Sequence, residues 1–263
     1  MTVIGTVDSL WRYPVKSMRG EELDEAFVGF PGLYGDRLFA FTSSAAPAGF
    51  PYFTGRDESA MLRYRPRFRD RARAARPKNL TEAESIGSGA NPLYGTPEDL
   101  LVDVETPSGE VLAVNDPALI AKLCDRLEGR HTLTLIRSER AITDCRPISL
   151  VSLQTAEQLG ARIGAHVDKR RFRANIYVNL ESAGGFGEDT YVGESLRIGP
   201  KVTISVLQRD SRCKMITLDP DTAESTPELL REVARAHEGM AGVYAAVLVE
   251  GTVRKGDVIE LLR

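Results

Sequence analysis

The sequence predicts a mixed α+β fold rich in β-structure, with a barrel-like β core, a few helices and an N-terminal β domain. Short stretches rich in Val, Ile, Leu and Thr recur along the 263 residues, bounded by Gly, Pro and Asp, as is typical of strands. Three amphipathic stretches have the start and stop signals of helices. Most of the expected strands are joined by short turns, which favours a barrel over a doubly wound α/β sheet.

The expected strands extend over the whole chain and alternate with polar turns. In chain order they lie within residues 3–17, 37–43, 100–114, 131–138, 174–180, 195–208 and 244–262. Residues 68–97 interrupt the pattern, because they are polar and contain Gly, Ser and Pro. We expect this segment to be an insertion or a mobile loop.

Each expected helix has its own capping residues. Asp116 and Pro117 predict a start and Gly129 a stop for the first helix, in which Cys124 lies on the apolar side. Thr226 with Pro227 and Gly239 repeat this arrangement near the C-terminus. The third helix can start at Ser152. A boundary near residue 118 would divide the chain into an N-terminal β domain (1–118) and a second domain (119–263).

Composition excludes several classes of protein. The formal charge of −3 gives no reason to expect nucleic acid or an anionic membrane as partner. No apolar run approaches the roughly 20 residues that span a bilayer. The N-terminus alternates like a strand and lacks the features of a signal peptide, so we expect a cytoplasmic protein. Three widely spaced cysteines and three histidines without ligand spacing argue against a disulfide framework or a structural zinc site.

One expected strand, residues 170–179 (RRFRANIYVN), combines apolar and cationic side chains. With a period of two, one face would carry Phe172, Ala174, Ile176 and Val178, and the other Arg171, Arg173, Asn175 and Asn179. The second face suits an anionic ligand, because arginine forms paired charge-assisted hydrogen bonds. A solvated strand face with surface ion pairs explains the same pattern, and the strand alone does not separate the two.

Short polar turns add further candidate anion-binding groups. In YPVKSMRG (residues 13–20), Lys16 and Ser17 offer an ammonium group, a hydroxyl and backbone N–H groups at one point. GDR (35–37) and TGRD (54–57) each place an arginine, Arg37 and Arg56, beside a turn glycine. Each turn taken singly is a weak signal.

The segment RDSRCKM (209–215) contains the cysteine of most interest. In extended conformation, Ser211, Cys213 and Met215 would face one way and Arg212 and Lys214 the other. Cys213 follows a long apolar strand and precedes the turn sequence DPDT. A thiol at a strand end beside a loop is accessible, as metal ligation or nucleophilic attack requires.

In this order, YPVKS, GDR, TGR, FRAN and SRC followed by LDPDT resemble the MOSC-domain family. These proteins are relatives of the molybdenum-cofactor sulfurase C-terminal domain and of the mitochondrial amidoxime reducing component. The resemblance spans almost the full chain. It implies an N-terminal β domain over residues 1 to about 118, followed by a MOSC-type β-barrel core.

The resemblance also implies a cofactor, the molybdenum cofactor (Mo-molybdopterin), and a set of site residues. Cys213 would ligate molybdenum through its sulfur. Lys16 and Ser17 would contact the pterin and phosphate. The same site would include other residues of the shared motifs or residues next to them: Arg37, Arg56, Cys145, Arg146, Ser152, Arg173, Asn175, Ser211 and Arg212.

The sequence departs from the family pattern at two of these positions. Relatives commonly have small residues before Pro147, whereas this chain has Cys145 and Arg146. Arg146 could narrow the opening or contact phosphate. Cys145 could bring a second thiol near Cys213 or simply pack. The glycine that often follows DPDT in relatives is Ala223 here.

Three functions remain open. The first is a molybdenum-dependent oxidoreductase that reduces N-hydroxylated small molecules and takes electrons from a separate donor protein. The second is a sulfur carrier or transferase with a persulfide on Cys213. The third is a module that stores or delivers the cofactor without turnover. The first two require Cys213, as metal ligand and as nucleophile respectively.

Overall fold

The computed structural model describes residues 1–86, 91–125, 132–181 and 184–262. Seven strands close a barrel in the order β12–β11–β15–β14–β13–β17–β1, and the pairing of β1 with β12 completes it. The barrel strands are β1 (Thr2–Arg12), β11 (Ile148–Ser152), β12 (Ile176–Leu180), β13 (Ser195–Ile198), β14 (Val202–Ser211), β15 (Met240–Val249) and β17 (Val258–Leu262). The β11–β12 pair is parallel, and every other pair in the barrel is antiparallel. The predicted β-rich fold with a barrel core is thus confirmed.

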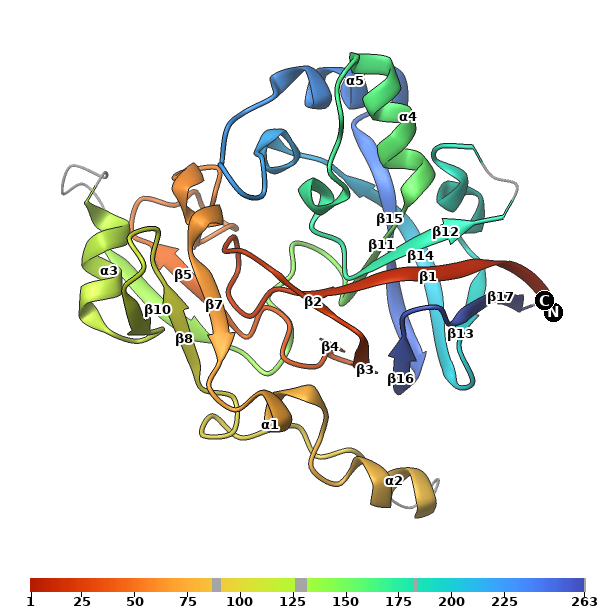
Figure 1. The fold of residues 1–263 in the computed structure, drawn as a ribbon, viewed down its shortest axis with the longest axis horizontal. Coiled ribbons are helices and arrows are strands. Elements are labelled where there is room, and N and C mark those ends of the chain that lie inside the picture. The colour runs from red at the N-terminus through yellow and green to blue at the C-terminus, as the bar shows by residue number, and fades with distance from the viewer. Residues whose placement is uncertain (87–90, 126–131, 182–183, 263) are drawn as a thin grey trace.

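The barrel interior is aliphatic, because alternate residues of each strand point inward. Val7, Ile148, Ile176, Ile204 and Ile259 are among its buried side chains. β1 runs from the barrel end at which both chain ends lie towards the N-terminal part (Figure 1). β2 (Glu21–Leu23) extends the sheet beyond β1.

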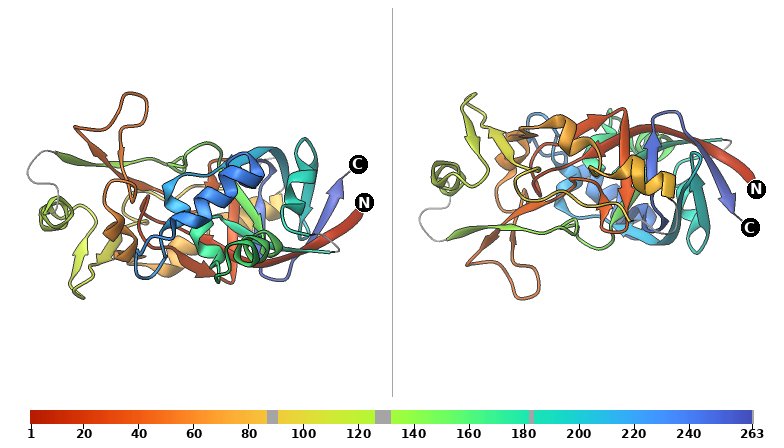
Figure 2. Two further views of the ribbon diagram at one scale, coloured as in Figure 1. Left: turned by 90° about the horizontal axis from the view of Figure 1, so that it is seen from above. Right: turned by 90° about the horizontal axis from the view of Figure 1, so that it is seen from below.

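The N-terminal part lies beside the barrel along the long axis of the molecule (Figure 2). It contains the sheets β10–β5–β6 and β7–β8–β9, and the sheet β16–β3–β4 joins it to the barrel end. The bounds are β3 (Glu25–Gly29), β4 (Gly32–Leu33), β5 (Phe39–Ser43), β6 (Tyr52–Phe53), β7 (Arg65–Phe68), β8 (Val102–Glu105), β9 (Val111–Ala113), β10 (Leu133–Arg137) and β16 (Gly251–Arg254). Its core is aromatic, with Phe27, Phe41 and Phe53 almost fully buried.

The three helices expected from capping signals are confirmed. α3 (Pro117–Cys124) is capped by Asp116, and α4 (Leu153–Ile163) by Ser152, whose hydroxyl accepts the N–H of Thr155. α5 (Pro227–His237) follows Thr226 and ends where Glu238 and Gly239 adopt positive φ. Cys124 packs against the N-terminal core as expected. Gly129 lies outside the described residues.

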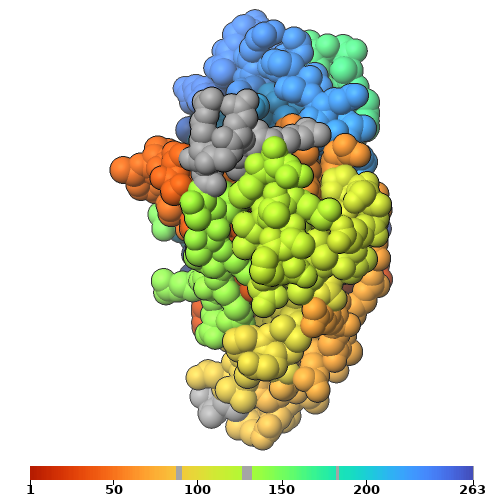
Figure 3. Space-filling view, turned by 90° about the vertical axis from the view of Figure 1, so that its left-hand side faces the viewer, coloured from red at the N-terminus to blue at the C-terminus, as the bar shows by residue number. Residues whose placement is uncertain are grey.

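Residues 68–97, expected to be an insertion or a mobile loop, contain two helices, α1 (Arg71–Ala75) and α2 (Leu80–Ile86). Whether the segment is an insertion stays a prediction. Asp70 caps α1 through the N–H of Arg73. Ala74 and Leu80 are buried in the N-terminal core, so a few apolar residues fix a largely polar stretch. Seen from its outer side, the N-terminal part presents residues near 100–125 at its centre, and α1 and α2 lie below them (Figure 3).

The proposed division at residue 118 falls within α3, and it stays a prediction. β1 belongs to the barrel, whereas β10, from the second segment, pairs with β5 of the first. The two segments therefore exchange strands. Among the described residues, no helix is long and apolar enough to cross a membrane.

Candidate functional site

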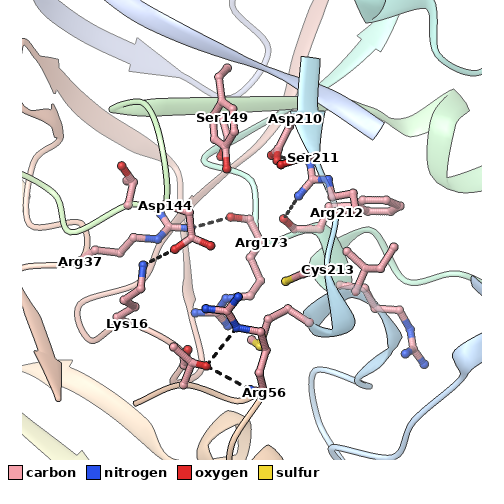
Figure 4. Close-up of a pocket in the computed structure, with 18 of the residues that line it drawn as sticks. Lys16, Arg37, Arg56, Asp144, Ser149, Arg173, Asp210, Ser211, Arg212 and Cys213 are labelled. Atoms are coloured by element: carbon pink, nitrogen blue, oxygen red, sulfur yellow. Dashed lines mark hydrogen bonds and ion pairs between the residues drawn. The ribbon is translucent and has the colours of Figure 1, made fainter. Parts of the chain in front are cut away.

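A pocket lies where one end of the barrel meets the N-terminal part (Figure 4). It holds about 710 Å³ of space that includes the open solvent at its mouth. We call it the cationic pocket, because it is lined by seven cationic side chains and only two carboxylates, an excess of five positive charges. The cations are Lys16, Arg37, Arg56, Arg146, Arg171, Arg173 and Arg212, and the carboxylates are Asp144 and Asp210.

Two guanidinium groups stack on one buried tyrosine at the base of this pocket. The Cζ atoms of Arg37 and Arg173 lie 4.6 and 4.3 Å from the centre of the Tyr13 ring. Nη2 of Arg37 also donates to the carbonyl oxygen of Arg173 over 2.8 Å. The ring thus keeps two like charges close together through cation–π contacts.

The two arginines differ in how their charge is balanced. Arg37 pairs with the buried carboxylate of Asp36, and this pairing raises the pKa of Arg37 although burial alone would lower it. Arg173 has no ion-pair partner among the described residues, and its Nη2 donates only to the carbonyl of Met18 at 2.8 Å. Burial lowers the pKa of Arg173 to about 10, so it stays charged at neutral pH. Arg173 is thus a charge available to an anion.

Strained backbone also gathers at this site. Six described non-glycine residues have positive φ, and three of them line the pocket: Ser17 (66°), Arg37 (45°) and Arg173 (52°). Such conformations cost of order 1–3 kcal/mol each and cluster at ligand sites. Ala223, where relatives often have glycine, is another of the six, with φ of 65°.

Lys16 forms one wall of the pocket. Its Nζ donates to the carbonyl of Ile142 at 2.9 Å, pairs with Asp144 and lies 4.9 Å from the centre of the Tyr52 ring. Burial lowers its pKa, while the nearby Lys16 charge helps to lower the pKa of Asp144 against its own burial. The Lys16 ammonium is therefore partly neutralised by Asp144, which is itself exposed to solvent.

Arg56 lies on the opposite side of the mouth from the barrel strands. Its Nε donates to Thr54 Oγ1 at 3.3 Å, and its Cζ lies 4.2 Å from the centre of the Phe50 ring. No carboxylate of the described residues pairs with it. Arg146 also lines the pocket and is exposed.

Cys213 lies at the turn that follows β14, and its half-buried side chain lines the pocket (Figure 4). Residues 211–215 are not extended throughout. β14 ends at Ser211, and Cys213 is the N-cap of the 3₁₀ helix η4 (Lys214–Thr217). Among the described residues, no cluster of three or more His, Cys, Asp or Glu side chains is arranged to hold a metal ion.

Arg212 holds the Cys213 turn in place. Its Nε donates to the carbonyl of Ala241 at 2.6 Å and its Nη1 to that of Phe172 at 2.8 Å. Its Nη2 lies 2.8 Å from a carboxylate oxygen of Asp210. The predicted residue Arg212 therefore lines the pocket, but its Nε and Nη1 donate to backbone carbonyls, and its buried Nη2 pairs with Asp210 without forming a hydrogen bond.

One acid at the pocket wall, Asp210, is not predicted from the sequence. Asp210, at the end of β14, is only 2% exposed, and its carboxylate hydrogen-bonds Tyr244 of the neighbouring strand β15. Burial raises the pKa of Asp210 to about 6, although Arg212 opposes this shift. Burial and Asp210 also raise the pKa of Tyr244. In a sequence, an isolated Asp within a strand pattern does not predict a buried acid at a pocket.

The expected strand face over residues 170–175 is wrong. Asp168 caps a 3₁₀ helix, η2 (Lys169–Phe172), Arg173 follows in a left-handed conformation, and β12 begins only at Ile176. Arg171 and Arg173 still reach the pocket, but from a turn. Nη1 of Arg171 donates to the carbonyl of Thr217 at 2.6 Å, and Nη2 lies 3.2 Å from Asp219.

Most of the predicted site residues come together here. The pocket is lined by Lys16, Ser17, Arg37, Arg56, Arg146, Arg173, Ser211, Arg212 and Cys213.

The other three predicted residues lie outside the lining set. Asn175 is fully buried and bonds Ser149 and the carbonyl of Trp11, which ties β11 to β1. Ser152 caps α4 and donates to Glu188 at 2.6 Å. Cys145 is exposed, and its sulfur accepts from Gln208 at 3.5 Å.

Comparisons with known proteins agree with this architecture. Residues 137–260 match the family model of the MOSC domain, and residues 4–81 match that of the MOSC N-terminal beta barrel domain. The mitochondrial amidoxime-reducing component 1 of Mus musculus is 25% identical over 98% of this chain and 83% of its own length. Component 2 of Bos taurus is 24% identical over 97% and 83%.

Among solved structures, the YUAD protein from Bacillus subtilis aligns over 98% of this chain and 95% of its own, with 16% identity and a TM-score of 0.47. YiiM from Geobacillus stearothermophilus covers 45% of this chain and 55% of its own, with 19% identity and a TM-score of 0.36. The two family models account for the barrel and for much of the part beside it. The chain therefore belongs to the MOSC-domain proteins that carry a MOSC N-terminal beta barrel domain.

Proposed function

We propose that this protein binds the molybdenum cofactor in the cationic pocket and reduces N-hydroxylated small molecules such as amidoximes. The observation that supports the proposal most directly is the position of Cys213, whose thiol lines a pocket with an excess of cations. A soft thiolate ligand beside anion-binding groups suits a metal that arrives within an anionic organic cofactor. Two distant relatives are named as amidoxime reducing components.

The residues present fit such a cofactor. A phosphate-bearing pterin needs cations that are not already neutralised, and Arg56 and Arg173 have no carboxylate partner among the described residues. Lys16, Ser17 and Arg37 would complete the contacts to its anionic end, and Cys213 would bind the metal. Arg212 keeps the Cys213 turn in place through two backbone carbonyls.

When bound, the cofactor supplies the two-electron redox chemistry that removes oxygen from an N–OH group. Reduction of N–OH to N–H with release of water consumes two electrons and two protons. Asp210, with a pKa of about 6, and Tyr244 hold exchangeable protons at the pocket wall. In this proposal they supply protons to the leaving oxygen, and the electrons come from a separate donor.

Benzamidoxime reduction with an artificial reductant tests this function. Cys213→Ser should abolish the reaction while the fold remains, because a serine hydroxyl does not replace a thiolate ligand at neutral pH. Cys145→Ser is the matched control, since that thiol lies outside the pocket lining, and it should keep most activity at equal cofactor content. Loss of activity in both variants would instead favour joint action of the two thiols.

A sulfur carrier is the second candidate, because an accessible thiol also suits a persulfide. Mass spectrometry of the purified protein separates the two. The added mass of one sulfur atom on Cys213, without metal, would support the carrier. Bound cofactor without any benzamidoxime reduction would instead support a storage or delivery module.

A further inference from the structure

A second pocket contains residues that lie close in sequence to residues of the cationic pocket. It is lined by Arg19, Arg65, Arg67 and Arg71 together with Gly20, Glu21 and Pro66, and we call it the arginine groove. Arg19 and Gly20 follow Lys16 and Ser17 of the pocket after one residue, Met18. The other arginines come from β7 and the start of α1.

The groove carries more positive charge than its carboxylates neutralise. Arg65 and Arg67 share the single carboxylate of Glu105, at 3.6 and 3.5 Å, and their side chains are about half exposed. Arg71 has no ion-pair partner among the described residues. The one carboxylate in the lining, Glu21, already pairs with Arg12 at 2.8 Å. Arg19 pairs with Asp221, which also pairs with Arg170. The exposed pairs with Glu105 are weak, so Arg65, Arg67 and Arg71 remain available to an incoming acidic surface.

The position of these arginines follows from the local strand pattern. In β7 (RPRF), Pro66 and Phe68 are buried whereas Arg65 and Arg67 point outward. β7 is an edge strand of the β7–β8–β9 sheet. Charged residues on an edge strand hinder pairing with a strand of another protein. These arginines therefore favour a partner that is recognised through side-chain charge.

The ring of Tyr13 contacts both the groove and a residue that lines the pocket. A Cβ on Gly20 would lie 2.5 Å from Cε1 of Tyr13, so the edge of that ring meets the groove backbone directly. The face of the same ring lies 4.3 Å from Cζ of Arg173, which lines the pocket. Tyr13 is 2% exposed. A redox centre docked at the groove would therefore approach the pocket across a thin, packed wall.

We propose that the arginine groove docks an acidic one-electron carrier protein that supplies the reducing electrons through the Tyr13 wall. The inference rests on the proposed function, which requires an external donor. Two successive carriers would each lose one electron, and together with two protons these convert N–OH to N–H and water. Positive charge at the groove would steer acidic carriers to this face and raise their association rate.

The test compares two reductants on the triple variant Arg65→Glu, Arg67→Glu, Arg71→Glu. With a reduced acidic [2Fe–2S] ferredoxin at low salt, the rate should fall by about tenfold or more, because the groove becomes repulsive. With reduced methyl viologen, which needs no docking surface, the rate should not change. The ferredoxin effect should shrink towards high salt as screening increases. Lys201→Glu, Arg231→Glu, Arg235→Glu is the matched control, since these exposed cations lie on α5 and between β13 and β14.

Binding of the oxidised ferredoxin, measured by calorimetry, tests the groove without any turnover. The triple variant should bind ferredoxin much more weakly than the control. A variant in which the same three arginines are replaced by Gln should have an intermediate affinity. Equal affinity of the control and charge-reversed proteins, or no ferredoxin binding by the wild type at low salt, would overturn the proposal. Tighter binding to anionic vesicles or to an oligonucleotide would assign the groove another occupant.

Failure of the proposed function gives a different pattern. In that case methyl viologen would drive no benzamidoxime reduction in the wild type, whereas charge-dependent ferredoxin binding would still report on the groove.

Discussion

At the scale of single residues, Arg171 and Arg173 line one pocket but differ in what they bind. Arg171 is committed to the Thr217 carbonyl and to Asp219, whereas Arg173 keeps a charge without a carboxylate partner among the described residues. The strand expected from the sequence would have placed both side chains on one face. The turn that separates them gives each a distinct role.

Arg173→Ala should lower cofactor content far more than Arg171→Ala. Arg171→Ala should instead lower the free energy of unfolding by about 1–3 kcal/mol, because it leaves a carbonyl and a carboxylate without their donor. Pterin content per folded protein and urea unfolding measure the two effects. Equal loss of pterin in both variants would mean that Arg173 has no special part in binding.

Sequence reasoning found many of the pocket residues but not their geometry. Lys16, Ser17 and Arg37 lie in turns with recognisable polar sequences, and five motifs in order indicated that they belong together. The two-residue period failed at Arg171 because it assumes an extended chain, whereas the Asp168 cap starts a 3₁₀ turn. Asp210 was missed because its burial depends on β15, a partner distant in sequence.

At the scale of elements, the neighbouring strands β14 and β15 hold a carboxylate that is costly to ionise. Burial raises the pKa of Asp210 from 3.8 to about 6, while Arg212 and Arg37 favour the charged form and Asp144 opposes it. Because the folded state binds this proton more tightly, the raised pKa stabilises the fold at pH values below the pKa of the unfolded state. That stability is lost as the pH rises through the pKa of the folded state. The shift corresponds to about 3 kcal/mol.

Asp210→Asn should therefore gain stability relative to the wild type as pH rises from about 4 to about 7, by roughly 3 kcal/mol. Asparagine keeps the shape and hydrogen-bonding capacity but does not titrate. Urea unfolding of both proteins across this range measures the difference, and Asp116→Asn at the start of α3 is the control. Parallel pH profiles for Asp210→Asn and wild type would show that the buried site does not hold its proton more tightly when folded.

Among the helices, some are predictable from the sequence and others are not. Helices with local start signals, such as Ser152 before α4 and Thr226 with Pro227 before α5, were predicted at the observed starts. α1 and α2 were missed because a few buried residues, Ala74 and Leu80 among them, fix an otherwise polar segment. Their burial comes from tertiary contacts that local composition does not reveal.

At the scale of the whole molecule, the pocket exists only because distant segments meet. The turn after β1, the loop after β6, the η2 turn and the end of β14 all contribute lining residues. Composition and periodicity predict strands and helices but not these long-range contacts. The resemblance to MOSC-domain proteins supplied that information, and the barrel closed by β1 and β12 agrees with it.

The molybdenum content of the purified protein tests the proposed site most directly. Protein isolated without oxygen from a host that makes the cofactor should contain about one molybdenum per chain, and the Cys213→Ser protein should contain less metal while retaining some pterin through its cationic contacts. Elemental analysis and fluorescence of the released, oxidised pterin measure both quantities on the same sample. Absence of molybdenum from the wild-type protein, with persulfide sulfur on Cys213 instead, would contradict a metal-dependent reductase.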